Sequence, residues 1–233
     1  MKKISAIFIL YILLALSGYS QSRSYVSSGA EMIFSFADIK DQGMSESSIL
    51  RWAPFINLQS FVNRDLNRHF GVFTGIAVRN VGYIYDNDTD PSNETVYKKK
   101  FRSYNVGIPL GIKIGNLDNL FFYGGYEVEF PFLYKEKTIE NGDKINTITG
   151  WFSNREELFQ HGFLVGFQLP RGFNLKFKYY LSEFHNQNFT DAFGIKPYAG
   201  LKSNIYYFSL NIPFFKNKKY FSPIIKNTEY AAR

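Results

Sequence analysis

Apolar and polar positions alternate with a period of two over four long segments of this chain. In the clearest segment, residues 120–134, apolar or aromatic side chains occupy nearly every second position, and Glu127, Glu129 and Lys135 fall on the opposite face. The other segments with this alternation are residues 103–114, 173–182 and 206–214. Successive side chains of a strand point to opposite faces, so the pattern predicts β-strands with one apolar and one polar face.

Weaker alternation adds further segments and brings the expected strand count to about eight. These segments are residues 25–37, 49–62, 69–86 and 158–169. Short links at residues 63–68, 116–118 and 170–172 alternate with long links at residues 38–48, 87–100, 136–157 and 185–202. This asymmetry is typical of an all-β, antiparallel, up-and-down transmembrane β-barrel, whose short turns face the periplasm and whose long loops face outward. The Asn141-Gly142 pair predicts a type I′ hairpin inside the third long link.

The two ends of the chain do not belong to this pattern. Lys2 and Lys3 precede an apolar run over residues 4–16, and small residues at Gly18 and Ser20 suit a signal peptidase. The run is shorter than the roughly 20 residues that a membrane-spanning helix needs. We therefore expect a cleaved signal peptide at residues 1–20, a barrel domain at 21–215 and a periplasmic C-terminal tail at 216–233, which lacks alternation.

Composition agrees with export and with strands that face lipid. The chain has no cysteine, which excludes disulfides, a thiolate metal site, a cysteine nucleophile and a lipid-modified N-terminal cysteine. It has 25 Phe, 17 Tyr and 2 Trp, which are too many for a core of this length to bury easily. Aromatic girdles that face lipid would use them.

Residues 104–113 and 122–130 look like paired central strands of the small outer-membrane β-barrels of Gram-negative bacteria. The chain thus resembles the OmpA-transmembrane and OmpX-like, porin-like barrel families over most of residues 25–215. The resemblance implies residence in the bacterial outer membrane. The partners it implies are membrane lipids, lipopolysaccharide and the barrel-assembly machinery. Such barrels usually end on an aromatic residue, whereas Phe214-Phe215 is followed here by more chain.

Charged side chains on the inward face predict a closed interior. An eight-stranded barrel encloses barely enough room for side chains, so buried carboxylates need cations close by. The expected ion-pair plug consists of Glu127, Glu129, Lys113, Lys176, Lys178 and Arg79. Alignment about the turn at residues 116–118 sets Gly107 opposite Glu127 and Asn105 opposite Glu129, so the cations would come from across the lumen.

A basic cluster precedes the alternating segment at residues 103–114. Lys98, Lys99, Lys100 and Arg102 lie where the second long loop returns to the outer leaflet. Clustered ammonium groups suit lipopolysaccharide phosphates, and a solvated charge run is the alternative. Nothing here indicates nucleic-acid binding.

Catalysis, cofactors and metals are not expected. His69, His161 and His185 lack the local motifs of outer-membrane deacylases and proteases, although the last two could approach serines and acids at the outer rim. The acidic run at residues 86–90 departs from an EF-hand loop, because Pro91 replaces the turn glycine and Tyr97 the bidentate acid.

These observations predict a non-enzymatic integral outer-membrane barrel that acts structurally or through its extracellular loops. A narrow porin-like channel or carrier for small solutes is the alternative. A soluble secreted binding barrel and an outer-membrane hydrolase rank below both.

Overall fold

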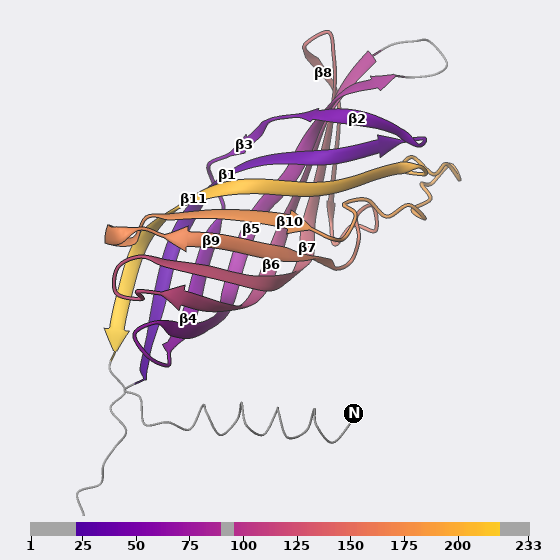
Figure 1. The fold of residues 1–233 in the computed structure, drawn as a ribbon. Helices are drawn as coiled ribbons and strands as arrows, with labels where there is room; N and C mark the ends of the chain where they lie inside the picture. Colours follow the sequence, from indigo (N-terminus) through magenta and orange to yellow (C-terminus); the bar gives the residue numbers. More distant parts are fainter. Residues whose placement is uncertain (1–21, 90–95, 220–233) are drawn as a thin grey trace, which may run out of the picture.

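A computed structural model describes residues 22–89 and 96–219 as one β-sheet that closes on itself (Figure 1). The expected signal peptide at residues 1–20 and residues 220–233 of the expected tail lie outside the described residues. The strands are β1 (Arg23–Asp41), β2 (Met44–Ile49), β3 (Arg51–Ala53), β4 (Leu58–Asp65), β5 (Phe70–Thr89), β6 (Val96–Gly115), β7 (Phe121–Glu140), β8 (Asp143–Trp151), β9 (Gln160–Gln168), β10 (Asn174–Tyr180) and β11 (Leu201–Lys219), with a 3₁₀ helix η1 (Pro170–Gly172) between β9 and β10.

The ring contains eight strand positions, which confirms the predicted fold class. Strands β2, β3 and β4 together occupy one position between β1 and β5. From β5 the order is β6, β7, β9, β10 and β11, and antiparallel pairing of β11 with β1 closes the barrel. Strand β8 pairs with β7 and prolongs that hairpin beyond the ring.

The two faces of the sheet have opposite chemistry. Outward positions such as Leu110, Phe122 and Leu210 are about half exposed or more. Inward positions such as Arg79, Glu127 and Lys178 have no measurable exposure. An apolar outside and a polar inside suit a barrel whose surroundings are lipid.

Short connections gather at one end of the barrel and long ones at the other (Figure 1). The short ones are residues 66–69, 116–120 and 169–173, at the end where β1 begins and β11 ends. At the other end the predicted hairpin is confirmed, because Asn141 and Gly142 have φ angles of 49° and 91°, as a type I′ turn requires. The first long link is itself a β1–β2 hairpin that turns at Gln42 and Gly43.

A β-bulge in β7 makes the predicted faces of that strand wrong beyond residue 132. The pairing with β6 shifts between Tyr104 and Asn105, where Phe132 is the extra residue. An extra residue reverses the alternation beyond it. Tyr134 is therefore buried inside the barrel, and Lys135, which we expected on the inner face, lies outside.

Two further boundaries differ from expectation. The β6–β7 turn spans residues 116–120, and the backbone N–H of Asn116 donates to the Leu120 carbonyl. As a result, Gly107 lies opposite Glu129 and Asn105 lies opposite Pro131. The predicted register was thus wrong by two residues because the turn is longer than expected. Strand β11 continues to Lys219 by pairing with β1, four residues past the expected end of the barrel domain.

In the part of the chain that the structure describes, no helix is long and apolar enough to cross a membrane.

The lumen divides into three levels along the barrel axis. Ion pairs fill the middle, an aromatic cluster fills the long-loop end, and a cavity lies at the short-turn end.

Candidate functional site

Six charged side chains form one network across the middle of the lumen, which we call the lumen network. Its members are Glu31 of β1, Arg79 of β5, Glu127 and Glu129 of β7, and Lys176 and Lys178 of β10. One ring position separates each of these four strands from the next, so the charges come from all sides of the barrel. The network therefore crosses the lumen instead of lining one wall.

Arg79 is the centre of the lumen network. Its guanidinium contacts all three carboxylates: Nη1 bonds to Glu31, Nη2 lies 2.9 Å from Glu127 Oε1, and Nε lies 3.3 Å from Glu129 Oε1. The planar guanidinium presents five donors in a fixed geometry, which suits several acceptors at once.

The two lysines complete the pairing. Lys178 Nζ lies 2.7 Å from Glu127 and 2.5 Å from Glu129, and Lys176 Nζ lies 2.5 Å from Glu31. The Tyr180 hydroxyl and the Asn105 amide donate to Glu129 Oε2 at 2.8 and 2.7 Å. Three carboxylates thus meet three cations, and the buried cluster is electrically neutral.

Lys113 does not join the lumen network, although we expected it there. It lies toward the short-turn end, where its Nζ is 2.6 Å from Asp65 Oδ1 and 3.0 Å from the Tyr25 hydroxyl. The sequence placed Asp65 in a turn, whereas β4 runs through it and directs it inward. Five of the six expected plug residues are therefore brought together, and Lys113 forms a second, separate ion pair.

Glu31 is the network member that the expected plug omitted. It lies on the inward face of β1, where residues 29, 31, 33, 35 and 37 are buried. The alternation of that strand placed it inside, and the need to neutralise Lys176 was the available signal. Its partner could not be read from the sequence, because β1 and β10 are not adjacent in the ring.

Aromatic side chains close the long-loop end of the lumen. Tyr83, Phe101, Tyr134 and Phe184 are nearly or fully buried and pack against one another. Residues 181–200, which connect β10 and β11, supply Phe184 to this cluster. Side chains thus fill the lumen at the long-loop end as well as at the lumen network.

The three histidines lie at separate places in the structure. His185 is fully buried against Tyr83, with its Nε2 2.9 Å from the hydroxyl, and burial and the charge of Lys99 lower its pKa to about 3. His161 Nδ1 lies 2.7 Å from the Tyr126 hydroxyl on the outer wall, and His69 lies in a short turn. No group of three or more His, Asp or Glu residues in the described segments could hold a metal ion.

Glu156 is a buried carboxyl that the sequence did not single out. It lies between β8 and β9, 3% exposed, and forms a β-bridge with His185. Burial raises its pKa to about 8, so the group is protonated at neutral pH. A neutral Glu156 beside a neutral His185 adds no charge to this end of the lumen.

The predicted basic cluster divides between the two faces of β6. Phe101 and Ser103 are buried inside, so Lys98, Lys100 and Arg102 point outward and Lys99 points inward. Lys98 pairs with Asp86 at 2.9 Å. Lys99 lies on the opposite face from the other three residues because successive side chains of a strand alternate. The prediction of one basic cluster did not take this alternation into account.

Beyond the β7 bulge, two lysines of β7 join the outward cations. Lys137 lies directly opposite Lys100, and Lys135 lies opposite Arg102. We call these four residues the cation square. Like charges directly opposite each other in a sheet destabilise it unless anions are near.

Comparisons with known proteins agree with this architecture. The model of the family described as outer membrane protein beta-barrel domain matches residues 19–186. This match confirms the resemblance to outer-membrane barrels that the sequence indicated. Comparison with curated protein sequences gives no match.

Solved structures of bacterial surface proteins are distantly similar. Ail, the attachment invasion locus protein of Yersinia pestis, in complex with the heparin analogue sucrose octasulfate, is 12% identical with a TM-score of 0.37, covering 83% of this chain and 99% of that chain. Neisserial surface protein A is 13% identical with a TM-score of 0.34, covering 81% and 96%. A FadL homologue of Pseudomonas aeruginosa is 12% identical with a TM-score of 0.29, covering 74% and 46%. Similarity at this level transfers no ligand and no role.

Proposed function

We propose that this chain, which belongs to the outer membrane protein beta-barrel domain family, is a non-enzymatic barrel with a closed lumen that acts structurally or through its extracellular end. The lumen network is the observation that carries the proposal. Six fully or almost fully buried charges, contributed by alternate strands, occupy the cross-section that a solute would have to pass.

The energetics favour a permanent closure over a gate. Separating a buried carboxylate from its cation costs several kcal/mol, because the remaining charge is left without a partner. Here each of the three carboxylates contacts two cations, so opening a path would break several contacts together. A narrow channel or carrier would need that rearrangement in each transport event.

Planar-bilayer recording of the purified protein tests the closure. We expect silence or rare small steps, with a general porin in the same bilayer as the positive control. Uptake of small sugars into proteoliposomes, measured by swelling, covers slow carriers. Steady, large conductance, or swelling faster than that of protein-free liposomes, would refute the closed lumen and favour a channel or carrier.

Localisation and export have their own test. We expect the protein in outer-membrane fractions and, in detergent, faster gel migration before boiling than after it. The mature N-terminus should be Gln21 by mass spectrometry, which would support cleavage of residues 1–20. Recovery of a soluble periplasmic species would contradict the membrane assignment.

We also propose that the cation square contacts lipopolysaccharide phosphates, and that lipids and the assembly machinery are the other partners. Lys100 with Lys137 and Arg102 with Lys135 form two adjacent cross-strand pairs of like charge on the outer face. Phosphate groups would remove their mutual repulsion and supply charge-assisted hydrogen bonds.

Binding to lipopolysaccharide-containing vesicles tests this contact. The double variant Lys100→Gln/Lys137→Gln should bind about 2 kcal/mol more weakly, or roughly thirtyfold, at about 1 kcal/mol for each cation. Lys40→Gln/Lys202→Gln is the matched control, because these exposed lysines also lie opposite each other, between β1 and β11. Equal losses in both double variants would show a general charge effect and refute the site.

A further inference from the structure

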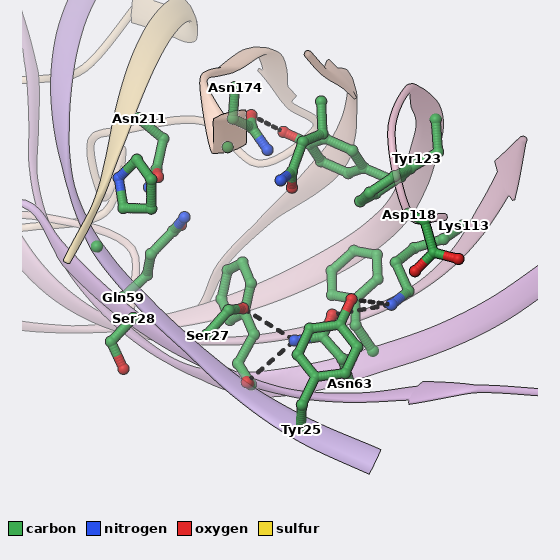
Figure 2. A pocket seen from close by; sticks show the side chains of 17 residues that line it. Tyr25, Ser27, Ser28, Gln59, Asn63, Lys113, Asp118, Tyr123, Asn174 and Asn211 are labelled. Atoms are coloured by element: carbon green, nitrogen blue, oxygen red, sulfur yellow. Dashed lines mark hydrogen bonds between the residues drawn. The ribbon is translucent and has the colours of Figure 1, made fainter. Parts of the chain in front are cut away.

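The short-turn end of the barrel contains a cavity that the proposed function does not use. Its volume is about 330 Å³, at the lower end of the roughly 300–1,000 Å³ of small-molecule sites. Asp118 of the β6–β7 turn (Figure 2) and Gly172 of the β9–β10 turn are among its lining residues, so the cavity lies at the short-turn end, which faces the periplasm in outer-membrane barrels. The lumen network lies farther along the barrel and makes the cavity a dead end.

The cavity wall combines side-chain amides with aromatic rings. Five of the lining residues are amides, namely Gln59, Asn63, Gln168, Asn174 and Asn211. Five others are aromatic, among them Phe73 and Tyr123, whose rings meet edge to face at 5.8 Å. Amides offer both donors and acceptors, while the rings offer flat apolar surface.

The charged residues at the cavity are already neutralised. Lys113 Nζ pairs with Asp65 at 2.6 Å, and Asp118 Oδ1 accepts from Arg23 at 2.7 Å. A charged ligand would therefore lose its hydration without gaining a free counter-charge. The wall is suited to a neutral ligand.

Two buried amide atoms at the cavity have no hydrogen-bond partner. These are the acceptor Gln59 Oε1 and the donor Asn211 Nδ2. Asn211 is only 6% exposed. By contrast, Asn63 donates to the Ser27 hydroxyl at 2.9 Å, and Asn174 accepts from the Tyr123 hydroxyl. Buried polar atoms are nearly always paired, so one unpaired donor and one unpaired acceptor at the same cavity indicate an external partner.

Gly29 gives the Asn211 amide the space it occupies. A Cβ at position 29 would lie 2.8 Å from Asn211 Oδ1 and 2.7 Å from the Ile212 carbonyl. Any other residue at this position of β1 would displace the amide. The absence of a side chain at Gly29 thus leaves room for the Asn211 amide beside the cavity.

We propose that this cavity binds a neutral sugar of monosaccharide size from the periplasmic side. A pyranose ring has hydroxyl groups that both donate and accept, which matches Gln59 Oε1 and Asn211 Nδ2. Its C–H faces are apolar and flat, which matches the aromatic wall. The ligand is sequestered on one side of the membrane and is not passed through.

Saturation-transfer NMR and calorimetry on the full chain in detergent micelles test the proposal, with glucose and N-acetylglucosamine as probes. We expect dissociation constants on the order of 1 mM, and binding about tenfold weaker in Asn211→Leu and in Gln59→Leu, because each variant lacks one hydrogen-bonding group. Asn188→Leu, an exposed amide at the opposite end of the barrel, is the matched control and should bind as the parent does. Positively charged glucosamine should bind more weakly than N-acetylglucosamine.

Heat-modifiable gel migration establishes that each variant is folded. If Asn211→Leu does not fold, Gln59→Leu, at a half-buried position, still tests the site. Absence of binding up to about 100 mM of either sugar would show that the cavity holds water only and overturn the proposal. Binding that is unchanged in both cavity variants would place the sugar elsewhere and overturn it equally.

Discussion

Replacement of Arg79 by Gln should be among the most destabilising single changes in this barrel. Arg79 has no exposed surface and contacts all three carboxylates of the lumen network. In the Arg79→Gln variant, three carboxylates face only Lys176 and Lys178, so one buried negative charge has no compensation. Breaking a buried ion pair in this way costs about 3–5 kcal/mol.

A second replacement should cost less in this variant than it costs alone. In Arg79→Gln/Glu127→Gln, the remaining charges form two complete pairs, Lys176 with Glu31 and Lys178 with Glu129, each at 2.5 Å. Charge balance then returns, so the double variant should lose less unfolding free energy than the sum of the two single losses. Coupling between residues in one such network is about 0.5–3 kcal/mol.

Urea unfolding in lipid vesicles measures these free energies. Trp52 and Trp151, both more than half exposed on the outer wall, report the transition by fluorescence, and unheated gel mobility reports the closed barrel independently. Lys202→Gln, which removes an exposed cation, controls for the change in net charge. Single losses that simply add up in the double variant would refute the neutral-network argument.

Three other changes probe the lipid face, the outer loops and the backbone packing. Leu110→Arg places a charge on a 68% exposed lipid-facing position and should cost roughly 2–4 kcal/mol in the same urea assay. Glu156 has a raised pKa of about 8, so its stabilising contribution is complete below about pH 4.5 and is lost as the pH rises through 8. Above pH 6.5 His185 no longer titrates, so Glu156→Gln should flatten the fall of the unfolding midpoint there. An unchanged slope would contradict the burial argument. A Cβ on Gly75 would meet the Ser60 carbonyl at 2.2 Å, so Gly75→Ala should cost about 1–3 kcal/mol, whereas Gly124→Ala, with its nearest contacts at 3.7 Å, should be nearly neutral.

The period-two alternation of the sequence predicts the barrel. Alternation fixes which side chains share a face, and each segment carries that information locally. The eight ring positions, the alternating short and long connections, and the Asn141-Gly142 hairpin could all be predicted for this reason. The inward placement of Arg79 and Glu127 followed from the same rule.

Local irregularities reversed some of these predictions. Residues 130–134 read Phe-Pro-Phe-Leu-Tyr, an unbroken apolar run in which alternation gives no face. The bulge at Phe132 lies in this run, next to a proline that lacks an N–H for the ladder. Lys135 therefore faces outward, and the cation square exists only because of that one extra residue.

Which inward residues contact each other depends on how the barrel closes. Partners such as Glu31 and Lys176 are 145 positions apart and lie on strands that are not neighbours in the ring. Their contact depends on barrel closure, on the registers of the intervening strands and on the length of each turn, which no local pattern encodes. The same geometry separated Lys113 from the lumen network and placed Gln59 and Asn211, from different strands, at one cavity, because the axial height of a side chain is set by register and not by sequence alone.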